Sequence, residues 1–414
     1  MKLPEGWHNK LLGDLFTKIV VGYVGNVNDH YCDAAIGVPF YRTLNIRDGY
    51  FRHDDIRYVT PEFNDKNKKS QIENDDILIA RVGANLGMVC KATGLNRTSN
   101  MANAIIIKSK SAKNADPDFY TYFLLSTYGK SQIYAGAAGG AQGVFNTKLT
   151  QEIAVPVPPL AEQKKIAQIL SAWDKAISVT EKLLTNSQQQ KKALMQQLLS
   201  GKKRLLDENG VMFSGEWEVV RLKQLIHEEK KRNRDNHIQR VLSVTNHSGF
   251  VLPEEQFSKR VASEDVSTYK IVKKNQYGYN PSRLNVGSFA RLDNYDEGVL
   301  SPMYVVFSIN HERLNSDYFL NWMSSNEAKQ RIAGSTQGSV RDSVGFDALC
   351  SFSFSLPTLM EQQKIAAVLS AADAEITTLE KKLACLKEEK KALMQQLLTG
   401  KRRVKVEVED TVCA

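Results

Sequence analysis

Four consecutive residues come nearest to a catalytic motif in this sequence: Asn280, Pro281, Ser282 and Arg283. An amino-methyltransferase with an Asn-Pro-Pro-Tyr motif uses its second proline and its aromatic ring to hold a base that is flipped out of the double helix. The present sequence has neither residue at these positions. We therefore expect no methyltransferase chemistry here and assign no catalytic residue to the chain.

Two further patterns that could carry chemistry are also incomplete. The glycine-rich run at residues 136–143, GAAGGAQG, lacks the Gly-Lys-Ser/Thr ending of a phosphate-binding loop and the spacing of a dinucleotide-binding loop, so we predict a flexible loop. The seven histidines include no His-Glu-x-x-His motif and no other paired spacing, so we predict no metal site. These absences favour a binding protein over an enzyme.

The composition indicates a polyanionic partner and a reducing compartment. The net charge of +9 suits a nucleic acid, although lysine-rich helix surfaces would give the same total. The five cysteines are scattered and never form a Cys-x-x-Cys pair, which favours reduced thiols. No apolar run approaches the ~18 residues of a membrane span, and the start has no signal segment. We expect a cytoplasmic protein with no membrane contact.

The sequence repeats itself after about 200 residues. KKALMQQLLSG at residues 191–201 returns as KKALMQQLLTG at 390–400, and the segment at 158–177 returns at 357–376. Both pairs are offset by 199 residues (390 − 191 and 357 − 158). Because solenoid repeats span only ~20 to 50 residues, each of these units can hold a whole domain with its connector.

The repeated segments predict two long helices, at residues 160–199 and 359–398. Their apolar residues alternate steps of three and four, which is heptad spacing. Lys191 and Lys390 lie on the apolar seam, where a polar residue can set the register of two helices. A helix of about 40 residues is about 60 Å long and needs a partner helix. The chain order of globule, helix, globule, helix favours antiparallel pairing, with the tail returning to the first globule.

A mixed α and β globule precedes each helix. In the first, residues 76–82 and 103–109 predict strands, and residues 116–136 predict one helix capped by Asp116. The second globule corresponds to it more faintly: residues 243–251 answer 43–51, 281–287 answer 81–87, and 316–325 answer the predicted helix. Trp217 answers Trp7, and we expect both to pack in the core. The globules therefore share a framework and differ in their surfaces.

These features resemble the specificity subunit of type I restriction-modification systems, above all in the helical repeats and in residues 279–307. The resemblance implies an α+β fold with two similar α/β target recognition domains. A long α-helix follows each domain, and the two helices pair as an antiparallel coiled coil with pseudo-twofold symmetry. The domain boundaries are 1–157 for target recognition domain 1, 158–205 for the first helical spacer, 206–356 for target recognition domain 2, 357–404 for the second spacer and 405–414 for a C-terminal tail.

The resemblance also implies the function. Each globule would recognise one half of an asymmetric bipartite site in double-stranded DNA. The helices would dock two modification (methyltransferase) subunits and, through them, two restriction (motor and nuclease) subunits. No cofactor is expected in this chain, whereas S-adenosylmethionine, ATP and Mg²⁺ are expected on the partner subunits.

Candidate DNA contacts are loop residues whose side chains can recognise base edges in the major groove. They are Arg42, Asn45, Arg47, Arg81, Asn85 and Asn103 in the first globule and Thr245, Asn246, His247, Ser282, Arg283 and Asn285 in the second. Asn85 and Asn285 precede Gly87 and Gly287 at matched positions, which also suits a turn. Lys270, Lys273 and Lys274 are expected to contact phosphate if they contact DNA.

The candidate spacer and partner-docking residues are the apolar positions of the helices: Ile166, Leu170, Trp173, Ile177, Leu194, Leu198, Ile365, Leu369, Ile376, Leu383, Leu393 and Leu397. Charged neighbours such as Glu162, Lys165, Glu361 and Lys364 would by default form a solvated face. Because the helices diverged less than the globules, we interpret their repeated outer surface, KKALMQQLL included, as the docking face for another protein.

Two other functions remain open at this point. One is a DNA-modifying enzyme with specificity and catalysis in one chain, which the incomplete motifs disfavour. The other is a coiled-coil scaffold without a DNA role.

Overall fold

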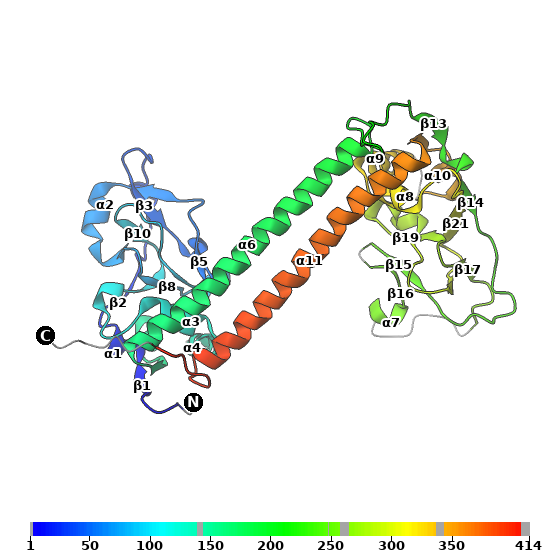
Figure 1. Cartoon of the computed structure of the whole chain (residues 1–414). Coiled ribbons are helices and arrows are strands. Elements are labelled where there is room, and N and C mark those ends of the chain that lie inside the picture. The colour runs from blue at the N-terminus through cyan, green and yellow to red at the C-terminus, as the bar shows by residue number, and fades with distance from the viewer. Residues whose placement is uncertain (1–2, 139–143, 247, 257–264, 337–342, 407–414) are drawn as a thin grey trace. The chain divides into compact units, whose positions relative to one another are not determined.

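The computed structural model describes residues 3–138, 144–246, 248–256, 265–336 and 343–406 of the chain (Figure 1). It divides into two compact units. The first unit comprises residues 1–181 and 381–414, and the second comprises residues 182–380. We call residues 1–157 the first globule and residues 206–356 the second globule. Each unit therefore holds one globule together with parts of both long helices.

Two four-stranded sheets form the body of the first globule. The predicted strands at 76–82 and 103–109 are confirmed as β8 (Ile77–Ala80) and β11 (Ala104–Ile107). They pair antiparallel at the centre of one sheet, and all their residues are buried. This sheet has the order β2 (Ile19–Val21), β11, β8, β9 (Val89–Lys91). The other has the order β6 (Arg57–Val59), β3 (Val38–Tyr41), β10 (Ser99–Met101), β7 (Gln71–Ile72).

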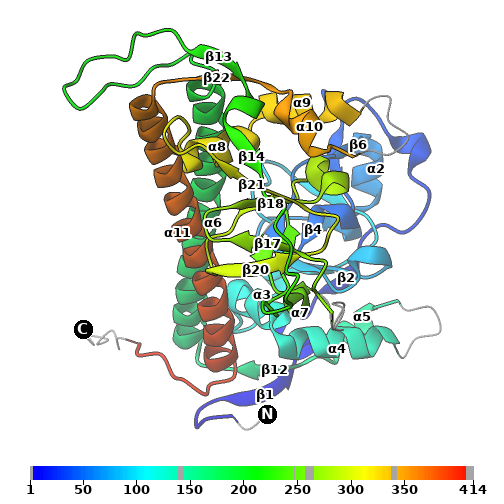
Figure 2. The same ribbon diagram turned by 90° about the vertical axis from the view of Figure 1, so that its right-hand side faces the viewer.

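Two short pairs of strands complete the first globule. β1 (His8–Leu11) pairs antiparallel with β12 (Ala154–Val157), and this closes the globule just before the long helix begins (Figure 2). β4 (Ile46–Arg47) and β5 (Tyr50–Phe51) form a hairpin. The short helices are α1 (Leu12–Leu15), α2 (Pro61–Lys66), α3 (Pro117–Leu125), α4 (Thr127–Ala138) and α5 (Thr147–Gln151).

The prediction of a single helix at residues 116–136 was wrong, because the chain breaks at Ser126 into α3 and α4. Asp116 caps α3 as expected, since its side chain accepts a hydrogen bond from the Phe119 amide. Ser126 is extended, and its hydroxyl accepts from the amide of Gly129 and so caps α4. The predicted loop at 136–143 was also wrong at its start, where residues 136–138 finish α4. Its residues 139–143 lie outside the described residues.

The second globule repeats one of the two four-stranded sheets, and its other strands form two-stranded pairs. Its sheet has the order β14 (Ile226–Glu228), β21 (Val305–Ile309), β18 (Tyr277–Tyr279), β19 (Phe289–Arg291). Its two-stranded pairs are β13 (Glu218–Arg221) with β22 (Ser353–Leu356), β15 (Ser243–Thr245) with β16 (Gly249–Val251), and β17 (Lys270–Lys273) with β20 (Glu297–Leu300). Its short helices are α7 (Pro253–Gln256), α8 (Ser316–Met323), α9 (Asn326–Thr336) and α10 (Phe346–Cys350).

The long helices are α6 (Leu160–Leu198) and α11 (Leu359–Leu397), each within one residue of the predicted end. They run side by side in Figures 1 and 2. In the first unit Lys390 pairs with Asp174 at 2.5 Å and Lys387 pairs with Glu181 at 2.8 Å. In the second unit Lys191 pairs with Asp373 at 2.5 Å. Because the residue number falls along α11 as it rises along α6, the helices are antiparallel. Lys191 and Lys390 thus each form an ion pair with the opposite helix, and their role in setting the register stays a prediction.

The core of each globule is completed by the ends of both helices. In the first unit, Ile166 and Leu170 near the start of α6 pack in one buried cluster with Leu397 and Leu398 at the end of α11. In the second unit, Ile365 and Leu369 near the start of α11 pack with Leu198 and Leu199 at the end of α6. KKALMQQLL therefore recurs in the sequence partly because its leucines fill the same place in two cores.

Candidate nucleic-acid interface

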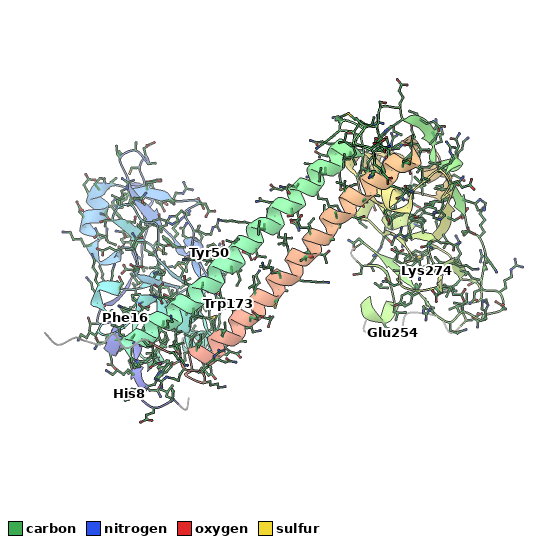
Figure 3. The ribbon with its side chains drawn as sticks, viewed as in Figure 1. His8, Phe16, Tyr50, Trp173, Glu254 and Lys274 are labelled. Atoms are coloured by element: carbon green, nitrogen blue, oxygen red, sulfur yellow. The ribbon has the colours of Figure 1, made fainter. Side chains whose placement is uncertain are left out.

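Two loops of the first globule that carry candidate DNA contacts are held together by side chains. The Asn85 amide donates to the Thr43 carbonyl at 3.3 Å, which joins the loop at 81–88 to the loop at 42–49. Lys130 of α4 donates to Asp48 and to the Gly87 carbonyl, both at 2.5 Å. Tyr50, at the start of β5, is 58% exposed beside these loops (Figure 3). The two loops thus form one braced surface.

Asn45 does not belong to the accessible part of that surface. Its side chain is completely buried; its amide donates to the carbonyls of Arg52 and Asp54, and its oxygen accepts from the Arg42 amide. A buried amide with these partners shapes the loop, and removing it leaves backbone groups unpaired. We therefore correct its assignment from a base contact to a loop-forming residue.

The other candidates of the first globule are half-buried. Arg42 forms an ion pair with Asp55 at 2.9 Å, and a guanidinium nitrogen of Arg47 donates to the Ile46 carbonyl at 3.1 Å. Arg81 is partly exposed at the start of its loop, and Asn103 has a left-handed backbone with φ of 50°, as a turn residue does. DNA contact by Arg42 and Arg47 requires them to exchange their present partners for phosphate or base atoms, whereas the buried Nε of Arg81 has no hydrogen-bond partner among the described residues.

The candidates of the second globule are more exposed. Asn246, Ser282, Arg283 and Asn285 all lie at the surface, the last three on the 3₁₀ helix η7 (Pro281–Val286). The Ser288 hydroxyl donates to the Val244 carbonyl at 2.8 Å and so joins η7 to the hairpin of β15 and β16. These side chains therefore share one surface.

Three details of this surface follow from local chemistry. Asn280 accepts from the Ser282 amide and caps η7, so the Asn-Pro-Ser-Arg segment is a helix start. Thr245 accepts from the Ser248 amide and donates to the Gly249 carbonyl, which closes the hairpin turn. Gly287 has φ of 94° and Gly87 has φ of 81°, so the prediction of matched turns is confirmed. His247 lies outside the described residues.

The lysines expected to contact phosphate differ in availability. Lys270 is partly buried and donates to the Tyr304 carbonyl at 2.7 Å, and burial lowers its pKa. Lys273 and Lys274 are exposed, and Lys274 is labelled in Figure 3. Lys270 is therefore a strand-anchoring residue, whereas the other two are accessible to a phosphate, although Lys274 lies 3.7 Å from the carboxylate of Asp296.

A buried carboxylate fixes each junction between a globule and the helix that follows it. Glu361 accepts from Arg204 at 2.5 and 2.8 Å and from the indole of Trp217 at 3.0 Å. Glu162 accepts in the same way from Arg403 and, at 3.3 Å, from the indole of Trp7. We call these the two carboxylate clamps.

The clamps correct the expectation of a solvated face at Glu162 and Glu361 and confirm the expected return of the tail to the first globule. Glu162 and Glu361 are 6% and 1% exposed, so they do not belong to a solvated face. Lys165 is exposed as expected. Arg403 also donates to the Glu5 carbonyl, which confirms for residues 401–406 that the tail returns to the first globule. Sequence reasoning missed Arg204 and Arg403, although they also recur at the offset of the repeat.

Half of the apolar helix positions are internal residues of the globule cores and not docking residues. Ile166, Leu170, Leu198, Ile365, Leu369 and Leu397 are completely or almost completely buried. The remaining six, Trp173, Ile177, Leu194, Ile376, Leu383 and Leu393, are partly buried. The proposed contact of the six buried side chains with another protein is therefore corrected, because each globule core already covers them.

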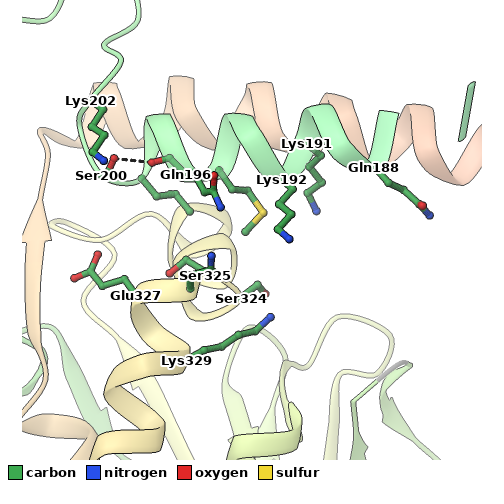
Figure 4. Close-up of a pocket in the computed structure, with 13 residues that line it drawn as sticks. Gln188, Lys191, Lys192, Gln196, Ser200, Lys202, Ser324, Ser325, Glu327 and Lys329 are labelled. Atoms are coloured by element: carbon green, nitrogen blue, oxygen red, sulfur yellow. Dashed lines mark hydrogen bonds between the residues drawn. The ribbon is translucent and has the colours of Figure 1, made fainter. Parts of the chain in front are cut away.

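The repeat also contains exposed residues, and these remain candidates for docking. They are Lys192, Ala193, Gln196 and Gln197 on α6 and their counterparts Lys391, Ala392, Gln395 and Gln396 on α11. In the second unit, Lys192 and Gln196 line a hollow of about 510 Å³ together with Ser324, Asn326 and Lys329 (Figure 4). We call the eight exposed residues of the repeat, four on α6 and four on α11, the repeated exposed surface.

Neither metal chemistry nor a membrane span has support in the described part of the chain. The described residues contain no group of three or more His, Cys, Asp or Glu side chains that could hold a metal ion. No helix among them is both long enough and apolar enough to cross a bilayer. Burial raises the pKa of the Cys90 thiol to about 12, so this cysteine is not a reactive thiolate.

Comparison with known proteins agrees with this geometry. The model of the type I restriction modification DNA specificity domain matches residues 4–186 and 214–388. The MjaVIII type I specificity subunit of Methanocaldococcus jannaschii is 24% identical, with 98% of this chain and 95% of that protein aligned. The putative MjaX specificity subunit of the same organism is 25% identical with the same coverage.

Solved structures show the same fold. The S subunit of a type I restriction-modification system from M. genitalium has a TM-score of 0.57 and 12% identity, over 96% of this chain and 98% of that one. A chain from a structure on complex assembly and conformational transition of the type I system has a TM-score of 0.52 and 15% identity, over 97% and 100%.

Proposed function

The chain belongs to the family of type I restriction-modification DNA specificity subunits, and from this membership we propose that its two globules recognise the two halves of an asymmetric bipartite DNA site. As a specificity subunit it is the DNA-recognition component of a larger complex and not the catalytic one. One observation carries the proposal: the globules share a framework, yet the loops at 43–51 and 81–87 differ from those at 243–251 and 281–287 in sequence and in the exposure of their candidate side chains.

The long helices would set the distance between the two half-sites. Each has 39 residues, and at 1.5 Å per residue this is about 60 Å, or roughly 18 base pairs of DNA. The antiparallel pairing and the equivalent ion pairs of Lys191 and Lys390 support a pseudo-twofold arrangement. We infer two short recognised words, separated by bases that the protein does not contact.

The repeated exposed surface would dock two modification subunits, one on each copy. A surface that occurs twice in one chain suits a partner that binds twice. S-adenosylmethionine would then belong to those modification subunits, and ATP and Mg²⁺ to the two restriction subunits that they recruit.

Mapping methylated adenines in a cell that carries the whole complex tests the proposal. We expect two different words at a fixed separation. One continuous palindrome would contradict it. Incubating the purified chain alone with DNA and S-adenosylmethionine tests the alternative of catalysis in the same chain, and methyl transfer there would overturn the assignment of chemistry to the partner.

The docking surface has its own test. Lys192→Glu combined with Lys391→Glu should abolish co-elution with the modification subunit, because both lysines are exposed and repeated. Lys164→Glu combined with Lys175→Glu is the charge-matched control, since both are exposed lysines of α6 and their counterparts in the repeat are Gln363 and Ala374. Equal behaviour of the two variants would remove these lysines from the interface.

A further inference from the structure

The densest positive charge of the second globule lies in residues 230–240, outside the candidate base contacts. This segment contains Lys230, Lys231, Arg232, Arg234 and Arg240 against a single acidic residue, Asp235. All five cations are exposed. Among the described residues, neither Lys231 nor Arg234 forms an ion pair, whereas Lys230 lies 3.1 Å from Glu228. Much of this charge is therefore not neutralised by the protein itself.

Hydrogen bonds hold the basic segment in one conformation. The Asn233 side chain is completely buried, donates to the Ile238 carbonyl at 2.8 Å and accepts from the Ile238 amide at 3.2 Å. The Lys231 carbonyl accepts from the amide of Ile271 in β17 at 2.9 Å. Ile238 and Ile271 then pack in a small apolar cluster. The cations are displayed from an ordered loop, so little conformational entropy is lost when they bind a ligand.

The ordered loop surrounds a hollow of about 480 Å³. Its lining consists of Lys230, Lys231, Arg232, Arg234, Asp235, His237 and Ile271. Asp235 accepts from His237 at 2.6 Å, so the one carboxylate in the lining already has a partner. We call this the basic hollow.

The first globule has no counterpart of this charge. Its segment between β2 and β3, residues 22–37, occupies the same place in the order of elements and contains no lysine or arginine. It contains Asp29 and Asp33 instead. The two globules therefore differ in charge as well as in their loops.

We propose that the basic hollow binds phosphate groups of the DNA backbone beside the half-site that the second globule recognises, so that the two globules contribute unequally to affinity. This inference rests on the proposed function. Exposed lysine and arginine side chains are the usual phosphate contacts, and such contacts position a protein on DNA without sequence preference. The segment is followed in the sequence by β15. Just before the hairpin of β15 and β16 begins, the Leu242 amide donates to the Val299 carbonyl and so holds the chain in place. Backbone contact and base contact would then come from one continuous stretch of chain.

The test is the salt dependence of DNA binding by the full chain. We compare the wild type with a variant carrying Lys230→Gln, Lys231→Gln and Arg234→Gln, which leaves Arg232 bonded to the Thr268 carbonyl. The control carries Lys10→Gln, Lys113→Gln and Lys223→Gln, which removes the same charge from exposed sites outside the hollow. Fluorescence anisotropy with a labelled duplex of random sequence, between about 50 and 200 mM salt, gives the slope of log affinity against log salt.

Each lost phosphate contact should reduce the magnitude of this slope by about 0.9, so the hollow variant should lose about 2 to 3 and the control less than 1. A charge-keeping variant with Lys230→Arg, Lys231→Arg and Arg234→Lys should retain the wild-type slope. Equal slopes for the hollow variant and the control would overturn the inference.

Two other outcomes separate the inference from its premise. If the hollow variant keeps its slope but no longer co-elutes with the modification subunit, the hollow binds an acidic protein surface and the inference is wrong. If the wild type itself shows no salt-dependent affinity for DNA, the proposed function fails together with the inference. A slope change in the hollow variant alone supports both.

Discussion

The two carboxylate clamps are nearly the same, whereas the recognition loops of the two globules are not. Glu162 and Glu361 each accept from one arginine and one tryptophan, and the equivalent Gln163 and Gln362 each donate to two backbone carbonyls and accept from one amide. By contrast, the matched loops at 43–51 and 243–251 differ: Asn45 is completely buried, whereas Thr245 at the corresponding position is partly exposed and closes a hairpin turn. The residues that join each globule to the long helices keep their partners in both copies, whereas the loops that carry the candidate DNA contacts have diverged.

The largest expected effect concerns the clamps. Glu361→Ala leaves Arg204 without its partner in a largely buried site and should destabilise the second unit by about 3 kcal/mol. Glu162→Ala should cost less, because the Arg403 side chain is 43% exposed and water can replace the carboxylate. Urea denaturation followed by circular dichroism measures both midpoints. Equal shifts would show that exposure of the arginine does not decide the cost.

The next effect concerns the break between α3 and α4 in the first globule and between α8 and α9 in the second. A Cβ at Gly129 would lie 2.3 Å from the Phe123 carbonyl oxygen, so Gly129→Ala should destabilise the first unit by about 2 kcal/mol. The counterpart in the second globule is Ala328, where two residues separate α8 from α9 instead of one. Ala328→Gly should therefore cost only about 1 kcal/mol, from helix propensity and lost packing. Thermal denaturation of both variants checks the difference.

A smaller effect should change specificity without changing stability. If Arg283 forms paired hydrogen bonds with a guanine, Arg283→Gln should weaken recognition of one base pair by about 1 to 3 kcal/mol and relax one position of the second word. The first word should remain as it was. Methylation mapping of the complex measures this directly, and Asn45→Ala serves as contrast, since it should lower stability and leave every word unchanged. Relaxation in both words would contradict the division of labour between globules.

The smallest effect concerns the ion pairs between the helices. Asp373→Asn removes the charge partner of Lys191 in a half-exposed pair and should cost about 0.5 kcal/mol. Asp174→Asn should cost slightly more, because Asp174 also accepts from Tyr122 at 2.7 Å, and burial together with this carboxylate raises the pKa of Tyr122 well above its usual value. A double-mutant cycle with Lys191 or Lys390 replaced by methionine isolates each pair. Equal stability losses for Asp373→Asn and Asp174→Asn would mean that Tyr122 adds nothing.

The sequence predicts the long helices and their register well, because heptad spacing and a duplicated lysine depend on local periodicity. It also predicts the shared framework, because turn glycines and helix caps recur at matched positions. It does not predict that Leu198 and Leu397 enter globule cores, since periodicity identifies an apolar face without its neighbour. It also misplaces Asn45 and Glu162, because a polar side chain has the same appearance in a sequence whether it meets water, a base or a buried arginine.

The sharing of helix ends between cores has a consequence for synthesis of the chain. Leu397 and Leu398 complete the first core, yet they are made after the whole of the second globule. At the ~5 to 20 residues per second of ribosomal elongation, Leu397 follows Leu170 by roughly 10 to 50 s, and for that time a nascent first globule has an unsealed apolar face. The second core draws its residues from positions 198–369 and from their immediate neighbours, so it closes while translation is still under way. The domain that is made first is thus the one that finishes folding last.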